Sequence, residues 1–450
     1  MDSTTVDRIA GRLSALAREH AVEGYEAYLS ETSKTSISLD DNRGIETLHA
    51  DEERAIAVRV LRDQRLGFSF SFNPSDIALE EAFKRALDST AVLERHPFSF
   101  VGNSPDTAGA DLFYDSTIES TPNEYKLGLL NALIDAVHID RRIVKVEKPS
   151  YEETISSVSV MNSSGVLKQS RTTRFGLGLS VIARQDRDSN ITWDFQGANT
   201  FGTLDAHRLG KGCAALALKT LGGERLRTGS YDAVFTQLVA SQFLGILARS
   251  FAADAVYKKT SLLADRLGQR VLPEHITITD DPLLKDGLGS VPFDAEGSPS
   301  VRKPLVDNGV AATFLYDNLY ASLMAAHTTG NSVRPSVTQP PSIGSTNLVL
   351  GSDRTGEEDL ERALYDGPVI TELMGVHTVN PVTGEFSLGA RGYAVKSGVF
   401  HAPLKDITVA GNLFDLLMKV RATGRDQLLY GTIMTPSLLI TQLKIAGADA

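Results

Sequence analysis

The chain has 450 residues, of which 42% are apolar and 22% are charged, and its formal net charge at pH 7 is −11. These fractions are ordinary for a globular protein, and the length suggests two or three domains. The excess of acidic residues repels nucleic-acid phosphates, so we expect no nucleic-acid partner. The longest apolar stretch, from Leu238 to Val256, is interrupted by an amide and two charged side chains, so we expect no membrane association either.

The cysteine count and the first residues indicate a compartment. Cys213 is the only cysteine, so the chain cannot form an intramolecular disulfide, and such a composition fits a reducing cytoplasm. Residues 1–13 carry acids and arginines where a signal peptide would have a basic end and an apolar run. The sequence therefore predicts a cytoplasmic protein.

The first part of the chain combines helical and β patterns. Apolar residues at helical spacing predict a helix over 7–20. Alternating apolar and polar residues then predict an antiparallel sheet, interrupted by turn-forming residues at 40–44. The strands are expected at 25–30, 35–39, 55–61 and 67–72, followed by a helix over 75–95 and a surface connection over 96–120.

A helix start is signalled after that connection. Thr121 is placed to cap the helix, Pro122 suits the first helical position, and Glu124 completes a capping box. Further on, the sequence predicts β structure over 142–199 with a hairpin turn at 162–165, and then a helix over 205–221.

Gly222, Gly223 and the polar residues that follow indicate a boundary between two domains, 1–225 and 226–450. Helices and strands mix without strict βαβ alternation, which predicts an α+β fold in which each domain combines an antiparallel sheet with helices. In the β-rich second domain we expect a strand at 231–235, a helix over 238–253, an exposed loop over 336–347, and a helix over 412–423 that Asn412 caps and Gly424 ends.

The common catalytic motifs are missing from the sequence. There is no P-loop, no Gly-x-Ser-x-Gly and no Cys-x-x-Cys. No histidine is followed by glutamate, and no two histidines lie within five positions of each other. A helix that binds zinc through two nearby histidines therefore cannot form. We expect this chain to supply no catalytic residue and no metal ligand.

Several segments beyond residue 160 resemble one protein family. They are MNSSG at 161–165, VYKKTS at 256–261, DP at 281–282, PFDAEG at 292–297, TGN at 329–331, TELMG at 371–375, GEFS at 384–387 and TVAGNL at 408–413. Together, and in this order, they resemble the TldE (PmbA) branch of the TldD/PmbA family of peptide-processing metalloproteases.

The resemblance implies a two-domain α+β protein that acts in a dimer, with a cleft for an extended peptide. In the TldD branch, zinc is held by a His-Glu-x-x-x-His helix and a distant cysteine. That motif would begin at Leu244, so Leu244 and Arg249 stand in the histidine positions and Gly245 in that of the catalytic glutamate. The stretch from Tyr430 to Thr435 should supply the cysteine and has none. The resemblance therefore implies that this chain binds no metal and that zinc resides in a TldD-type partner.

The peptide cleft implied by the resemblance has five candidate residues. Arg249 has two interpretations: an arginine that pairs with a nearby acid such as Asp254, or a fixed charge that holds a peptide carbonyl or carboxylate. The other candidates lie beside family-like motifs, where solvated polar side chains are the ordinary alternative: His327, Asn331, Arg334 and His377.

Three functions remain open on the sequence. The first is a non-catalytic subunit that completes a heterodimeric TldD/TldE metallopeptidase acting on unfolded peptides. The second is a metal-free peptide-binding protein that forms homodimers. The third is a metallopeptidase whose metal site is built from scattered His, Asp and Glu residues.

Overall fold

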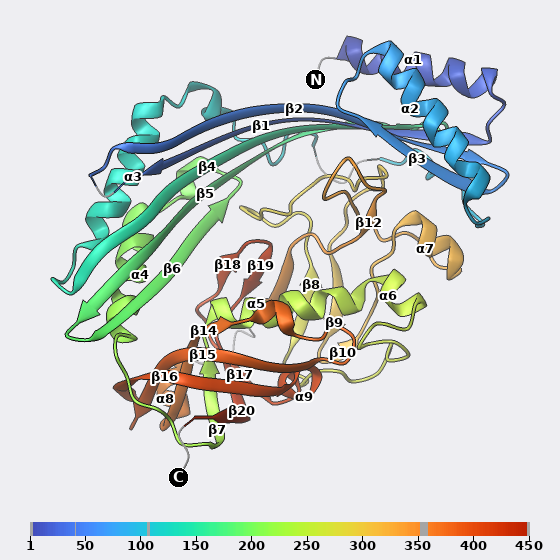
Figure 1. The fold of residues 1–450 in the computed structure, drawn as a ribbon. Helices are drawn as coiled ribbons and strands as arrows, with labels where there is room; N and C mark the ends of the chain where they lie inside the picture. The colour runs from blue at the N-terminus through green and yellow to red at the C-terminus, as the bar shows by residue number, and fades with distance from the viewer. Residues whose placement is uncertain (1–2, 41, 106–108, 352–358, 448–450) are drawn as a thin grey trace.

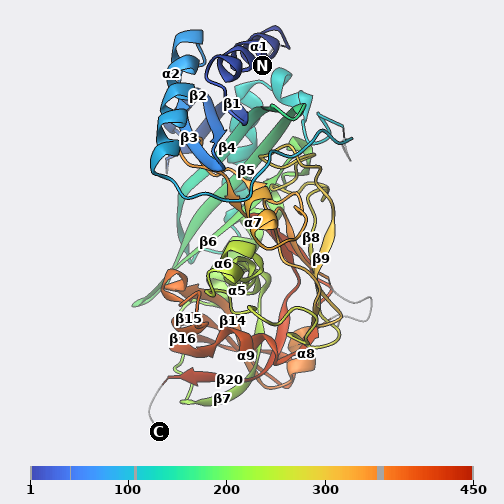
Figure 2. The same ribbon diagram turned by 90° about the vertical axis from the view of Figure 1, so that its right-hand side faces the viewer.

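A computed structural model describes residues 3–40, 42–105, 109–351 and 359–447. The N-terminal half forms a long, curved sheet that arches over the C-terminal half (Figure 1). The view turned by 90° shows the same two parts one above the other (Figure 2). Within the described ranges, no helix combines the length and apolarity needed to cross a membrane.

Six antiparallel strands form the curved sheet, in the order β3-β2-β1-β4-β5-β6. They are β1 (Gly24–Leu39), β2 (Ile45–Arg62), β3 (Arg65–Ser71), β4 (Ile143–Asn162), β5 (Leu167–Gln185) and β6 (Asp188–Ala198). The strands predicted at 25–30 and 35–39 are one strand, because the polar residues between them pair with β2 on one side and β4 on the other. The turns predicted at 40–44 and 162–165 lie between β1 and β2 and between β4 and β5.

Two pairs of helices pack on the outer face of this sheet, one pair at each end (Figure 1). They are α1 (Ser3–Glu19) with α2 (Asp76–Ser89), and α3 (Asn123–Val137) with α4 (Ala206–Lys219). Alternate strand residues such as Ile56 and Val58 bury against α1 and α2, and Phe175 and Leu177 lie in the core with α3 and α4. The opposite face of the sheet is therefore turned toward the C-terminal half.

One of the predicted helix starts is wrong. Ser75 caps α2 and Asp205 caps α4 through their side chains, at the residues where the sequence predicts that these helices begin. Thr121 does not cap α3, because its hydroxyl donates to the carbonyl of Thr117 at 2.7 Å and closes the preceding 3-10 turn. Pro122 occupies the N-cap position instead, and the helix begins one residue later than the capping box predicts.

The C-terminal half contains two further six-stranded sheets around one large apolar core. The first has the order β10-β9-β8-β13-β19-β18, with β8 (Thr277–Asp280), β9 (Lys303–Asp307), β10 (Val310–Ala311), β13 (Leu348–Gly351), β18 (Leu428–Tyr430) and β19 (Ile433–Thr435). The second has the order β16-β15-β14-β7-β20-β17, with β7 (Gly229–Phe235), β14 (Gly367–Met374), β15 (Glu385–Lys396), β16 (Val399–Asn412), β17 (Val420–Thr423) and β20 (Leu438–Ala446). A small ladder joins β11 (Ser332–Val333) to β12 (Ser342–Ile343), and the helices are α5 (Gln237–Ala248), α6 (Ala253–Tyr257), α7 (Asn318–Leu323), α8 (Leu360–Leu364) and α9 (Leu413–Leu417). The α+β class predicted from the sequence is confirmed.

Two helices of this half are shorter than predicted, because the residues at their predicted C-terminal ends form backbone hydrogen bonds with other segments. The helix expected over 238–253 stops at Ala248, since the backbone around Ala252 bonds to that of Leu315 on both sides. The helix expected over 412–423 stops at Leu417, since the residues from Val420 onward pair with β20. Asn412 does cap this shorter helix, but Gly424 follows a strand and so does not end a helix.

Candidate functional site

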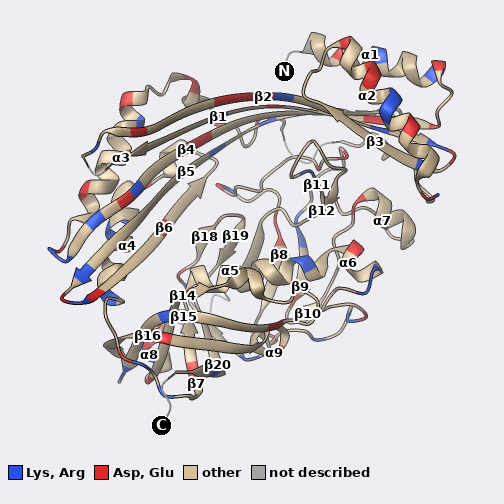
Figure 3. Cartoon of the chain, viewed as in Figure 1, with Lys and Arg blue, Asp and Glu red and all other residues tan. Residues whose placement is uncertain are grey.

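The helix at which the resemblance locates the altered metal site, α5, lies between sheets of the C-terminal half. It has no charged residue, as Figure 3 shows. Its N-terminus is held by Gln237, whose side-chain amide donates to the backbone and side-chain oxygens of Asp426 at 2.7 Å each. Phe243, Leu244 and Leu247 are buried in the large core. Burial of this apolar face holds the helix in place.

The three positions that would carry two ligands and a base do not converge. Leu244 is fully buried, Gly245 is exposed, and Arg249 follows the end of α5 with 49% of its side chain exposed. The side chain of Leu244 thus lies in the core, whereas that of Arg249 lies at the surface.

The stretch from Tyr430 to Thr435 lies directly beside α5. Strands β18 and β19 pack against the helix, and a Cβ atom at Gly245 would lie 3.2 Å from the Cδ1 of Ile433. The structure thus brings together the two segments that the resemblance assigns to the metal site. A side chain at position 245 would therefore press against the Cδ1 methyl group of Ile433.

Arg249 has a partner of its own. Its Nη1 donates to Oδ1 of Asp254 at 2.8 Å, and its Nη2 donates to Oδ2 of the same carboxylate. Lys258 lies 3.6 Å from that carboxylate as well. The pairing is the one that the first interpretation of Arg249 describes. Contact between Arg249 and a peptide stays a prediction.

Strand β6, at the edge of the curved sheet, reaches this region with aromatic side chains. The ring of Phe195 contacts that of Tyr430 edge-on, with 5.5 Å between centroids, and stacks on Trp193 at 5.9 Å. Burial raises the pKa of Asp194 to about 6, and burial together with Asp194 raises the pKa of Tyr430. Nothing in the sequence singles out Trp193, Asp194 and Phe195, since period-two alternation on a strand does not reveal which distant segment will cover it.

The side chains around α5 do not suit a zinc ion. Leucine and isoleucine offer no lone pair, and arginine stays protonated and repels a cation. The single thiol, Cys213, is buried on α4, donates to the carbonyl of Thr192, and has a pKa raised by burial, so it suits a core position. Nowhere in the described ranges do three His, Cys, Asp or Glu side chains gather in a way that could hold a metal.

Comparison with known proteins identifies the family. Models described as PmbA/TldA metallopeptidase domain 1, central domain and C-terminal domain match residues 25–90, 116–221 and 228–447. The Metalloprotease PmbA homolog of Buchnera aphidicola subsp. Baizongia pistaciae is 30% identical over 315 residues, which cover 70% of this chain and 68% of that protein. The chain belongs to the PmbA/TldD metallopeptidase family, in its PmbA (TldE) branch.

Other PmbA-type proteins match over almost the full length. Metalloprotease PmbA of Escherichia coli O157:H7 is 28% identical over 431 residues, covering 94% of this chain and 92% of that protein. A solved structure from Thermotoga maritima MSB8, described as a proposed modulator of a DNA gyrase, has a TM-score of 0.90 and 27% identity. It covers 98% of this chain and 100% of that one, so the PmbA-type fold is shared from end to end.

The PmbA-like TGN segment lies in a buried polar cluster. Asn331 is fully buried, its amide nitrogen donates to Asp280 at 2.7 Å, and its oxygen accepts from Lys303 at 2.9 Å. Asp280 is fully buried too and accepts from the backbone and hydroxyl of Thr346. Asn331 therefore orders the loops around it, where the sequence favoured a solvated loop or a peptide contact.

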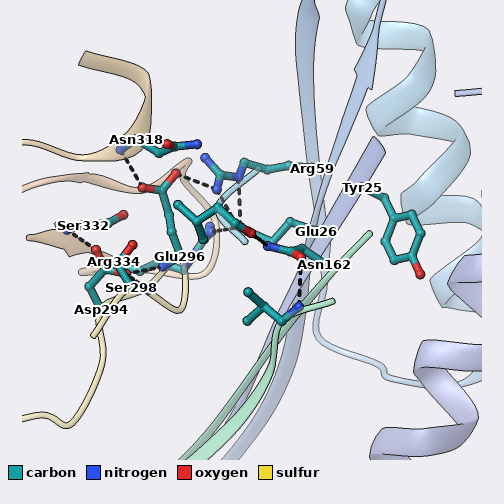
Figure 4. A network of polar contacts seen from close by, with 12 residues as sticks. Tyr25, Glu26, Arg59, Asn162, Asp294, Glu296, Ser298, Asn318, Ser332 and Arg334 are labelled. Carbon is teal, nitrogen blue, oxygen red and sulfur yellow. Dashed lines mark hydrogen bonds and ion pairs between the residues drawn. The ribbon is translucent and has the colours of Figure 1, made fainter. Parts of the chain in front are cut away.

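Arg334 belongs to a second buried cluster, which joins the two halves of this PmbA-type chain (Figure 4). Arg59 on β2 donates to both oxygens of Glu26 on β1, at 2.9 and 2.6 Å, and to Glu296 at 2.7 Å. Arg334 lies 3.7 Å from Glu26, stacks over the ring of Tyr28, and has a side chain that is 1% exposed. We call Glu26, Arg59, Glu296 and Arg334 the junction cluster.

Burial shifts the pKa values of acids and bases in and around the junction cluster. Burial lowers the pKa of Arg334 to about 10 and raises that of Glu26. Burial, followed by the charge of Glu296, raises the pKa of Asp294 to about 8 and that of Asp317 to about 7. Because Asp294 also accepts backbone hydrogen bonds from Glu296, Ser298 and Ser332, it fixes the loop that carries Glu296.

The remaining candidates, His327 and His377, are both exposed on turns. His327 follows α7, and His377 lies in a 3-10 turn after β14. The structure shows no contact between them and gives neither a buried partner within the described residues. Their contact with a peptide stays a prediction.

Proposed function

We propose that this chain is the non-catalytic, TldE-type subunit of a heterodimeric metallopeptidase that processes or degrades unfolded peptides. A TldD-type partner supplies the zinc and the catalytic glutamate. One observation carries the proposal: α5 and the Tyr430–Thr435 stretch lie together, as the resemblance expects for the two parts of a metal site. The positions expected to carry ligands and base nevertheless hold Leu244, Gly245 and Arg249, and Gly245 lies against Ile433.

Those side chains leave the chain without two requirements of zinc-dependent hydrolysis. A metal must be held by lone-pair donors, and a base must take a proton from the attacking water. Gly245 has no side chain to act as that base, and Arg249 is paired with Asp254. The role left to the chain is to complete the dimer and hold part of the peptide. On the sequence alone we place this complex in the cytoplasm, away from nucleic acid and membranes.

A metal-free homodimeric peptide-binding protein is the second candidate. It is favoured by a cavity of about 750 Å³ with a mostly apolar lining, which can take a peptide side chain without a metal. Such a protein would bind peptides without a zinc-bearing partner.

The test is to purify the chain alone and together with the TldD-type protein encoded in the same genome. We expect a one-to-one complex by size exclusion with mass measurement, and zinc after dialysis in the complex only. Zinc retained at about one ion per isolated chain would contradict the proposal. If the chain does not bind the TldD-type protein and instead forms dimers with itself, the result would favour the homodimer.

A further inference from the structure

A cavity lies where the segment after β3 and α2 meets the C-terminal half. Its volume is about 750 Å³, within the range of small-ligand sites. One wall comes from residues 101–104, and the others come from loops at 298–304, 312–313 and 328–330. Most of the lining is apolar, including Val101, Pro299, Val301, Pro304 and Ala312.

Ser298 gives this cavity an unused hydrogen-bonding group. The side chain lines the cavity and is 4% exposed, and its Oγ has no hydrogen-bond partner among the described residues. Buried hydroxyl groups are nearly always hydrogen-bonded, to protein, water or ligand. By contrast, the hydroxyls of Thr313, Thr328 and Thr329 in the same lining donate to backbone carbonyls. Ser298 therefore brings to this wall a buried hydroxyl that has no partner among the described residues.

Lys303 supplies a second donor to the same cavity. Its ammonium donates to Asp280 at 3.2 Å and to Asn331 at 2.9 Å, and 12% of the side chain is exposed. An ammonium group has three N–H donors, so one remains for an acceptor in the cavity. The buried carboxylate of Asp280 already compensates the charge of Lys303. The cavity therefore offers donors without a net positive charge.

We infer that this cavity binds a segment of extended peptide through a backbone carbonyl. The carbonyl oxygen accepts from Nζ of Lys303 and Oγ of Ser298, and an adjacent aliphatic side chain packs against the apolar wall. A neutral amide carbonyl fits better than a C-terminal carboxylate, because the Lys303–Asp280 pair has no net charge to neutralise an anion. This inference rests on the proposed function, in that it takes unfolded peptide as the ligand class.

The test is a ligand-observed NMR titration of the full chain with N-acetyl-leucyl-alanine amide and with the corresponding free acid. We expect the amide to bind at least as tightly as the acid. Ser298→Ala should raise the dissociation constant of the amide about three- to tenfold, which is the effect expected from the loss of one hydrogen bond. Ala312→Trp should abolish binding, because the indole fills the cavity from an exposed position.

A matched control separates a ligand contact from a structural effect. Ser250 is also buried with an Oγ that has no partner among the described residues, but it does not line this cavity. Ser250→Ala should leave the dissociation constant of the amide unchanged. Ser298→Ala should unfold at the same denaturant concentration as the wild type or a higher one, because no hydrogen bond within the chain is lost.

The inference is overturned if the amide does not bind, if only the free acid binds, or if Ser298→Ala and Ala312→Trp bind it as the wild type does. These results are independent of the dimer. Cleavage by the mixture of this chain with its TldD-type partner, combined with unchanged probe binding by the variants, would reject the cavity and keep the proposed function. Probe binding that depends on Ser298, combined with no effect of this chain on the activity of the partner, would keep the cavity and reject the proposed function.

Discussion

The region around α5 and the junction cluster differ in how deeply their charged side chains are buried. Beside α5, the position at which the resemblance expects the metal holds leucine, glycine and isoleucine, and Asp254 pairs with Arg249 and Lys258 partly in solvent. In the junction cluster, Arg59, Glu26 and Glu296 are each less than 5% exposed and contact one another directly. The chain therefore has apolar side chains where zinc chemistry would need ligands, and buried charges where its two halves meet.

The largest effect should come from breaking the junction cluster. Arg59→Met leaves Glu26 and Glu296 buried without their shared cation, which should lower the free energy of unfolding by about 3–5 kcal/mol. Urea denaturation measures the loss. The matched control is Arg54→Met on the same strand, whose ion pair with Glu31 is exposed. It should cost less than about 1 kcal/mol. Equal losses in the two variants would show that the cluster is not a special contact between the halves.

A second pair of substitutions tests whether α5 is now a core element. Leu244→Ala removes a fully buried side chain and should cost about 2–5 kcal/mol. Arg249→Ala removes a half-exposed ion pair and should cost less than about 1 kcal/mol. The same urea curves compare them. A larger loss at Arg249 than at Leu244 would contradict the assignment of roles along this helix.

The pH dependence of stability should show a smaller effect from the acids near the junction cluster. Burial raises the pKa of Asp294 from 3.8 to about 8 in the folded chain. The folded state therefore keeps a proton that the unfolded state releases, so this contribution is complete below pH 3.8 and is lost as the pH rises through about 8. Asp294→Asn cannot titrate, so wild-type stability should fall relative to the variant by about 1 kcal/mol or more between pH 5 and 8.5. A constant difference would show that Asp294 is ionised throughout.

Local patterns in the sequence predicted the elements of the N-terminal half and several helices of the C-terminal half, and tertiary pairing decided where some of them end. The hairpin turn at 162–165 and the helix starts at Ser75 and Asp205 depend on a few neighbouring residues, so they were predictable. The ends of α5 and α9 depend on Leu315 and on β20, which lie far along the chain. Helical periodicity near Asn412 and Gly424 could not reveal that the intervening residues would join a sheet.

In the candidate site, too, local motifs were readable from the sequence and tertiary contacts were not. Family motifs indicated that α5 and the Tyr430–Thr435 stretch share a site, and the structure brings them together. The sequence singled out Arg334 and the segment that carries Glu296, but not their partners Glu26 and Arg59, because these two alternate with apolar neighbours as solvent-facing strand residues do. Glu296 reaches them from a position 237 residues after Arg59. Only the packing of one half on the other shows that these charges are buried.

The most direct test of the proposed role compares peptide cleavage by three samples at equal total concentration: this chain alone, its TldD-type partner alone, and the two together. We expect no cleavage of an unfolded peptide by this chain alone, because it has neither lone-pair donors for a metal nor a base beside α5. The mixture should cleave it faster than the partner alone, and a chelator should abolish that activity. Cleavage by the partner alone that equals the mixture, or chelator-sensitive cleavage by this chain alone, would contradict the assignment of a completing, non-catalytic subunit.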